Sequence, residues 1–167
     1  VISRRIADQH RQHLESIKDS VKFADFSKAD LTKNGWFTSG DSFTDSSSMP
    51  GDWSQAQNDF VIPGRANGGL NGGKMQGVLR SPTFTIQHNQ IHHRLAARKG
   101  GLQIRLIIDG YYMEPYNGLL FGGTRVNAPN TDGNNNWISQ GRDIKMYKGH
   151  KAHLEFIDHG DGYFDVD

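Results

Sequence analysis

Short runs in which every second residue is apolar recur along this chain, and they constrain its fold more than any other feature. In the run LQIRLII, Leu102 and Ile104 alternate with Gln103 and Arg105. Successive side chains of a β-strand point to opposite faces, so this spacing predicts a strand with one apolar face. Gly, Asn, Asp and Pro separate further runs of strand-like composition, which are VKFADF, NGWFTS, DFVIP, GVLRSPTFTIQ, IHHRLAA, WISQGRDIKMY and HKAHLEFID. No helical pattern lies between these runs, which predicts an all-β fold, an antiparallel β-sandwich.

Residues 1–20 have a different period. Ile6, His10, Leu14 and Ile17 recur at helical spacing in a stretch that contains neither Gly nor Pro. This spacing predicts an amphipathic helix, which we interpret as a linker helix that leads into the sandwich. We therefore expect two parts, an N-terminal helix over 1–20 and a β-sandwich over 21–167.

Charge and composition exclude several classes of protein. The formal net charge is +1 and no stripe of Lys and Arg alternates with aromatic residues, so we expect no nucleic-acid partner. No apolar run is long enough for a membrane span, so we expect no membrane insertion. The absence of cysteine excludes disulfides and thiolate zinc sites. The chain begins at Val1 without an initiator Met or a signal peptide, and we expect a segment of a larger protein.

Four stretches carry a resemblance to a known family, and they occur in the order FADFSKADLTKNGWFTSGDSF, GVLRSPTFTI, LQIRLIIDGYYM and YKGHKAHLEFIDHGDGYFDVD. In this order they resemble the carbohydrate-binding-like jelly-roll domain of large planctomycete-type multidomain proteins, where it stands beside c-type cytochrome domains. They are also similar to the accessory β-sandwich of some fructan-hydrolysing enzymes. The matching positions, from about Phe23 onward, are Asp25, Phe26, Gly35, Trp36, Gly40, Phe43, Ser81, Pro82, Phe84, Ile86, Asp109, Gly110, Gly149, Asp158, Val166 and Asp167.

The resemblance implies a jelly-roll β-sandwich that recognises carbohydrate outside the cytoplasm, in the extracellular space, in the periplasm or at the cell surface. It also implies a structural cation, often Ca²⁺, that joins the first strand to the last. One departure is Ser27, which stands where the family has an acid.

Carboxylates crowd the final run, IDHGDGYFDVD, around a turn that contains two glycines. Calcium takes six to eight oxygen ligands, which carboxylates and turn carbonyls supply. The predicted calcium ligands are Asp25, Asp158, Asp161 and Asp167. The alternative is a solvated Asp-Gly turn whose acids face water.

Polar, Gly-rich stretches supply candidate sugar-binding groups, because loops at the ends of a sandwich commonly carry binding residues. Aromatic faces stack on the C–H patches of sugars, and polar side chains hydrogen-bond the hydroxyl groups. The predicted carbohydrate-binding residues are Trp137, Tyr111, Tyr112, Asn117, Arg105 and His93. The alternative is that Trp137 packs under its own loop and that Tyr111 and Tyr112 close one end of the core.

These observations favour a non-catalytic carbohydrate-binding module that directs a larger extracytoplasmic protein to a polysaccharide or oligosaccharide. A hydrolase needs two carboxylates about 5–10 Å apart across a cleft, whereas the acids here cluster in turns. Two alternatives stay open: a protein-interaction or structural domain that contacts neighbouring domains of a multidomain cytochrome, and a glycan-active hydrolase or lyase.

Overall fold

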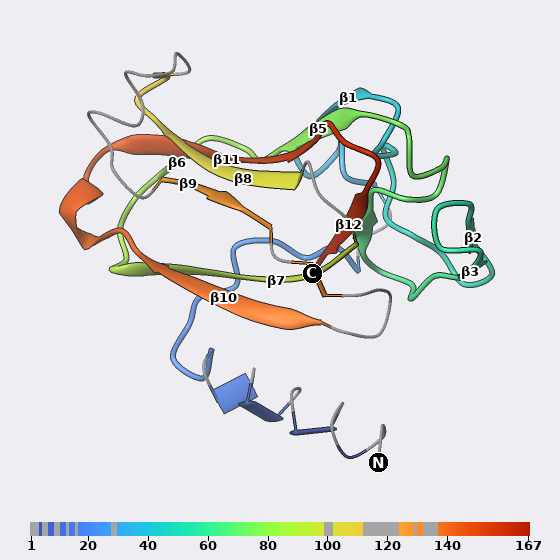
Figure 1. Cartoon of the computed structure of the whole chain (residues 1–167). Coiled ribbons are helices and arrows are strands. Elements are labelled where there is room, and N and C mark those ends of the chain that lie inside the picture. Colours follow the sequence, from blue (N-terminus) through green and yellow to red (C-terminus); the bar gives the residue numbers. More distant parts are fainter. Residues whose placement is uncertain are drawn as a thin grey trace.

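The computed structural model describes residues 4, 7–8, 11–12, 14–15, 17–27, 30–98, 102–111, 124–128, 130–131 and 137–167. Within these residues the fold is all-β, and two antiparallel sheets face each other (Figure 1). The prediction of an antiparallel β-sandwich is therefore confirmed.

The six-stranded sheet has the order β1 (Phe37–Gly40), β5 (Gly77–Arg80), β11 (Lys151–Asp158), β8 (Leu102–Ile108) and β9 (Arg125–Asn127), with β6 (Phe84–Thr85) paired to β11. The four-stranded sheet has the order β10 (Ile138–Asp143), β7 (Gln90–Arg98), β12 (Tyr163–Val166) and β4 (Ala66–Asn67). A short hairpin joins β2 (Trp53–Ser54) to β3 (Asp59–Phe60), and a 3-10 turn, η1 (Lys145–Tyr147), follows β10.

The core lies between the two sheets. It is built from alternate residues of the strands, those whose side chains point inward. Ile104 of β8, Phe156 of β11 and Leu95 of β7 are each at most 2% exposed and belong to one cluster. Trp36 and Phe43 are buried in the same cluster, although neither lies in a strand. This interdigitation of apolar residues fixes which face of each sheet points outward.

Glycine is required where β1 meets the turn that leads into β5. Gly40 has φ of 75°, and a Cβ atom at this position would overlap the Gln76 carbonyl oxygen and the Gly77 Cα. The close approach of the two backbones therefore depends on the missing side chain.

The predicted strand VKFADF is wrong, because residues 21–25 have no regular structure. The Asp25 carboxylate accepts hydrogen bonds from the backbone N–H and the hydroxyl of Ser27, and it forms an ion pair with Lys22. Such local bonds favour a turn over a strand ladder. Phe26 still packs on Trp36, with ring centres 5.0 Å apart.

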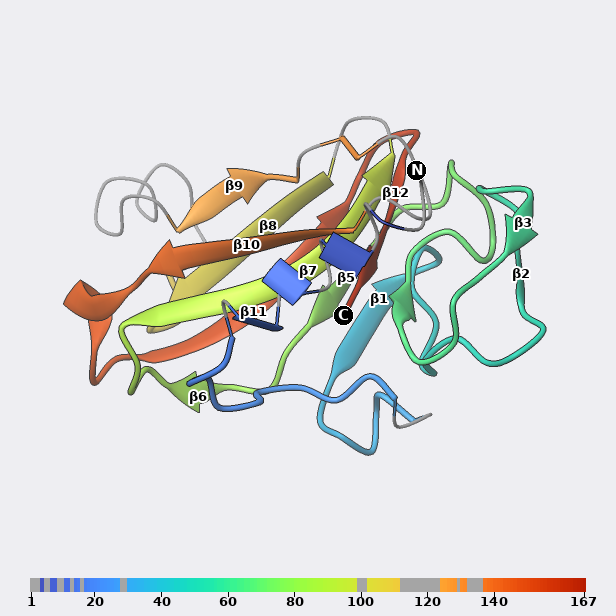
Figure 2. The ribbon, with the colours of Figure 1, turned by 90° about the horizontal axis from the view of Figure 1, so that it is seen from below.

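The N-terminal segment lies on the side of the four-stranded sheet (Figures 1 and 2). Its helical and exposed residues are Arg4, Ala7, Asp8, Arg11, Gln12, Leu14 and Glu15. The residues between them lie outside the described part of the chain, so a continuous helix over 1–20, and the boundary at residue 21, stay predictions. Among the described residues, no helix has the length and apolar character to span a membrane.

Candidate functional site

Strand β7 places basic side chains on the outer face of the four-stranded sheet. Leu95 and Ala97 face the core, so the period of two directs Arg94 and Arg98 away from it. Backbone hydrogen bonds of 2.9 and 3.3 Å join Asp167 to Arg94 and extend the ladder between β12 and β7. Side chains at directly opposed positions lie on the same face, so Arg94 and Asp167 meet.

Four side chains form what we call the arginine–tryptophan cluster: Arg65, Arg94, Trp137 and Asp167. The Asp167 Oδ2 atom lies 3.2 Å from both Arg65 Nη2 and Arg94 Nη1. The two guanidinium carbons lie 5.6 and 5.2 Å from the centre of the Trp137 ring. Trp137 is only 6% exposed, whereas the side chains of Arg65 and Arg94 are 23% and 14% exposed. Cation–π contacts and charged hydrogen bonds therefore hold two guanidinium groups in place above a buried ring.

Two buried N–H groups of the cluster have no acceptor among the described residues. Arg65 Nη1 donates to the Gly64 carbonyl oxygen at 2.8 Å, but Arg65 Nε is buried without a partner. Trp137 Nε1 is also buried without a partner. A buried donor without an acceptor costs about 1–3 kcal/mol, so the surroundings of these two groups are poorer in acceptors than in donors.

A buried carboxylate, Asp165, lies on the same face of β12 as Asp167, two residues earlier. It is 5% exposed, and its Oδ2 atom accepts a hydrogen bond of 3.0 Å from Gln57 Nε2. Burial raises the pKa of Asp165 to about 7, although hydrogen bonds from Gln57 and Gly68 act in the opposite direction. Asp165 Oδ1 and Gln57 Oε1 have no hydrogen-bond partner in the part of the chain that the structure describes. Asp165 thus carries a proton far more readily than an exposed aspartate does.

A second buried carboxylate ties β11 to the loop after β4. The Ser42 hydroxyl lies 2.7 Å from Asp158 Oδ2 and 3.0 Å from the Gly68 carbonyl oxygen. Burial raises the pKa of Asp158 to about 6, while the hydrogen bonds from Ser42 and the Gly160 backbone lower it. Buried polar contacts therefore join the end of β11 to the segment after β4.

The aspartates predicted to bind calcium do not come together. Among the described residues, which include all four, no group of three His, Asp or Glu side chains is placed to hold a metal ion. Asp167 is paired with two arginines, Asp158 is buried against Ser42, and Asp161 is exposed. Cations and a hydroxyl group lie where further carboxylates were expected, so this set of residues does not fit a calcium ion.

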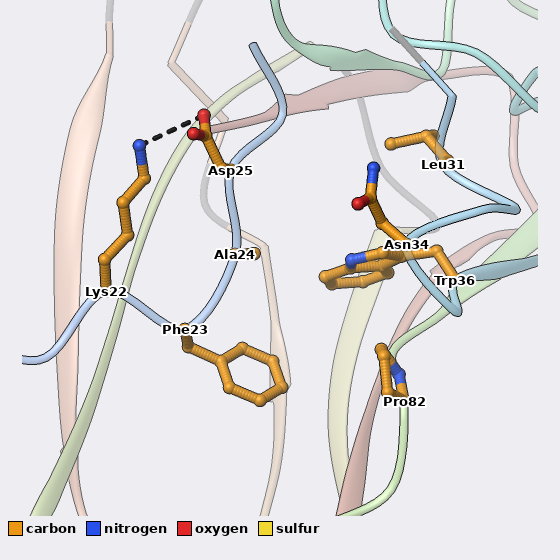
Figure 3. A pocket seen from close by; sticks show the side chains of 8 residues that line it. All are labelled: Lys22, Phe23, Ala24, Asp25, Leu31, Asn34, Trp36 and Pro82. Carbon is orange, nitrogen blue, oxygen red and sulfur yellow. Dashed lines mark ion pairs between the residues drawn. The ribbon is translucent and has the colours of Figure 1, made fainter. Parts of the chain in front are cut away.

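Asp25, the fourth of these aspartates, lines a pocket of about 320 Å³ (Figure 3). Its carboxylate lies 3.1 Å from Lys22 Nζ. Hydrogen bonds from Ser27 and then from Lys22 lower the pKa of Asp25 to about 2. The pocket is lined by Lys22, Phe23, Ala24, Asp25, Leu31, Asn34, Trp36 and Pro82. Asp25 therefore interacts with its own turn and not with the final strand.

Two of the predicted sugar-binding residues are buried. The Trp137 ring is covered by the two arginines, so it supports the surface and does not offer a face for direct stacking on a sugar. His93 is 7% exposed, lies 3.1 Å from Gln140 and contacts the Phe156 ring inside the sandwich. Burial lowers the pKa of His93 to about 4, so the ring is neutral in the core. A sugar contact by His93 is therefore wrong, because the ring points between the sheets.

The other predicted sugar-binding residues are not gathered with Trp137. Arg105 lies on β8 in the six-stranded sheet, opposite Glu155 and Arg125 in the register. Tyr111 is 47% exposed and follows β8. Tyr112 and Asn117 lie outside the described residues, so their roles stay predictions.

Sequence analysis missed the two arginines of the cluster and an exposed aromatic pair. Arg94 alternates with the core residue Leu95, and this alternation was the available signal for an outward-facing cation. Trp53 and Phe60 are paired across the hairpin of β2 and β3, with ring centres 5.1 Å apart, and are 47% and 63% exposed. A two-residue strand carries no period, so no signal marked this pair.

Comparison with known proteins gives no sequence match and one weak structural similarity. No protein-family model and no curated protein sequence matches the chain. The chain is similar to a solved structure of TmCBM61 in complex with beta-1,4-galactotriose, at 17% identity and a TM-score of 0.48, over 88% of this chain and 92% of that one. These values are too low for either fold or function to rest on the similarity.

Proposed function

We propose that this chain is a non-catalytic carbohydrate-binding module, a jelly-roll domain that acts outside the cytoplasm within a larger protein. The observation that carries the proposal is the arginine–tryptophan cluster, in which two partly exposed guanidinium groups are fixed on the outer face of the four-stranded sheet. The expected ligand is an oligosaccharide or polysaccharide, and neighbouring domains of the parent protein are further expected partners.

Guanidinium groups suit this role because they are planar and have several N–H donors in a rigid arrangement. Two such groups fixed side by side offer donors at spacings that pairs of sugar oxygens match. Side chains that are already ordered lose little conformational entropy on binding. The Trp137 ring and the Asp167 carboxylate supply this order from the two sides of Arg94, because Trp137 directly precedes β10 and Asp167 directly follows β12.

The same cluster is poorly suited to glycoside hydrolysis. Hydrolysis needs a carboxylate and a second carboxyl group across the scissile bond. Asp167 is paired with two arginines, and Asp165 is buried beneath the surface. Within the described residues, the cluster therefore lacks a paired acid and base.

The test is affinity electrophoresis of the full chain through gels that contain neutral and acidic polysaccharides. We expect retardation by at least one polysaccharide, a large loss of it in Arg94→Ala, and unchanged retardation in Lys148→Ala. Lys148 is an exposed cation in the turn after η1, away from the cluster, and is the matched control. Circular dichroism must show that Arg94→Ala is folded. Equal retardation of Arg94→Ala and the wild type would rule out the cluster as the site.

A second candidate is a protein-docking domain, and the exposed pair Trp53 and Phe60 favours it. Two large aromatic side chains at these exposures form a small apolar surface on the β2–β3 hairpin. Replacing Trp53 by Ala separates the two candidates. If retardation by polysaccharide survives in Trp53→Ala and fails in Arg94→Ala, the sugar site is the cluster and the hairpin serves another contact.

A further inference from the structure

The arginine–tryptophan cluster carries an unbalanced positive charge. Two guanidinium groups, those of Arg65 and Arg94, share the single carboxylate of Asp167, which leaves a formal charge of +1. The nearby acid, Asp165, interacts electrostatically with Arg65, but it is buried and bonded to Gln57, and burial raises its pKa to about 7, so it carries only part of a negative charge at neutral pH.

Apart from Asp165 and Asp167 on the β12 side, the described residues beside the cluster add no acid to this part of the sheet. On β7 the next outward-facing basic residue after Arg94 is Arg98, which is exposed. On β10 the outward-facing residues beside this stretch are Ser139 and Gly141, because Ile138 and Gln140 face the core. The outer face around the cluster therefore combines two partly buried cations with one exposed cation and neutral neighbours.

The unsatisfied groups of the cluster are donors. Among the described residues, Arg65 Nε and Trp137 Nε1 are buried without acceptors, and one N–H group of each guanidinium lies 3.2 Å from Asp167 Oδ2. A guanidinium has five N–H donors. A sugar hydroxyl that accepts one of these also brings a donor that needs its own acceptor, whereas an anionic group brings acceptors alone. The excess of charge and the excess of donors therefore indicate the same ligand chemistry.

We propose that the arginine–tryptophan cluster selects saccharides that carry an anionic oxygen group, a uronate carboxylate or a sulfate ester. The inference rests on the proposed carbohydrate-binding function and names its ligand class. A carboxylate has two coplanar oxygens that match one edge of a guanidinium, and a sulfate has three oxygens that reach both arginines. Arg94 and Arg65 hold the anion, and Trp137 and Asp167 position the two arginines.

The experiment compares a uronate with its own neutral form. Isothermal titration calorimetry of the full chain is performed with oligogalacturonates, with the same oligomers after reduction of the carboxyl groups, and with a sulfated galactan oligomer. The reduced oligomers keep the linkage and lose only the charge, so they isolate the contribution of the anion. Three variants are measured in parallel: Arg94→Gln, Arg65→Gln and the exposed control Lys148→Gln.

We expect an affinity about tenfold or more higher for an anionic oligomer than for the reduced one. Arg94→Gln and Arg65→Gln abolish this preference, while Lys148→Gln keeps it. Tight binding of the sulfated galactan alone assigns the anion to sulfate and supports the inference. Melting curves establish that each variant is folded. If one of the two arginine variants does not fold, the other still tests the inference.

Other outcomes overturn the inference in distinguishable ways. Equal affinity for the uronate and its reduced form removes the anion preference and leaves the proposed sugar-binding function standing. An equal loss in Lys148→Gln assigns the preference to overall charge and not to the cluster. If none of these oligomers binds and no polysaccharide retards the chain in gels, both the inference and the proposed function fail.

Discussion

Replacing Asp165 by Asn is expected to stabilise this protein at alkaline pH. With respect to the described residues, one oxygen of the buried Asp165 carboxylate has no hydrogen-bond partner, and the Gln57 side chain that bonds the other oxygen has an unpaired Oε1. An asparagine keeps the acceptor for Gln57 Nε2 and adds an N–H₂ donor for which Gln57 Oε1 is an available acceptor. The substitution thus removes a buried charge and supplies the missing donor at nearly unchanged volume.

The pKa of Asp165 gives the size and the sign of the effect. Burial raises it from 3.8 to about 7. Between these values the folded state binds more protons than the unfolded state, so the free energy of unfolding falls as the pH rises. Above about pH 7 both states are ionised and the full cost is present, about 3 pKa units at about 1.4 kcal/mol each, or about 4 kcal/mol. Below about pH 4 both states are protonated and the cost is absent.

The assay is urea unfolding of the wild type and Asp165→Asn at several pH values between 4 and 9. We expect a variant that is more stable by up to about 4 kcal/mol at pH 8, with the difference closing towards about pH 4. Asp161→Asn is the control, because Asp161 is an exposed carboxylate in the turn that leads into β12. Some pH dependence remains in the variant, since the pKa of Asp158 is also raised, to about 6. The reasoning is refuted if Asp165→Asn is equal to or less stable than the wild type at pH 8.

Three further predictions concern the framework. Leu79 is completely buried, and its strand lies between β1 and β11. In urea titrations, Leu79→Ala is therefore expected to lower the free energy of unfolding by about 2–5 kcal/mol. A loss below about 1 kcal/mol would contradict the place of Leu79 in the core. Gly40 and the exposed Gly149 both have a φ that is unfavourable for alanine, but only at Gly40 would the added Cβ also overlap the neighbouring backbone. Gly40→Ala is therefore expected to lower the melting temperature more than Gly149→Ala does. Equal losses would disprove the close contact. Because the predicted calcium ligands lie apart, we expect equal melting temperatures in millimolar calcium and in chelator. If calcium stabilises the wild type and Asp158→Asn removes that stabilisation, the predicted calcium site is reinstated.

Strands with a sustained period of two were predictable from the sequence, and shorter ones were not. In β8 and β11, apolar residues recur at every second position over seven and eight residues, and both strands were predicted. β2 and β4 have two residues each, too few for a period to appear. The run at 21–26 has the composition of a strand, but hydrogen bonds of Asp25 to Ser27 stabilise a turn instead. Local side-chain chemistry overrode β propensity there.

The candidate site was less predictable because it depends on strand register. Trp137 and Asp167 were singled out as functional residues, yet their partners Arg94 and Arg65 come from β7 and from the loop before β4. Only the pairing of β12 with β7 brings Asp167 beside Arg94. Arg65 follows from the pairing of β12 with β4, which links residues that lie far apart in the sequence. Neither pairing leaves a local pattern, so the acids of the final run were assigned to a cation and not to arginines.

The placement of β11 and β12 has a consequence for how the chain is made. β11 lies between β5 and β8 in one sheet, and β12 lies between β7 and β4 in the other. Both sheets thus lack an inner strand until the ribosome has delivered residues 151–166. Earlier strands leave the exit tunnel with open hydrogen-bonding edges, which invite association between nascent chains. Because the last strands complete both sheets through long-range pairing, folding is expected to be slow. The open strand edges are expected to need protection from association during synthesis.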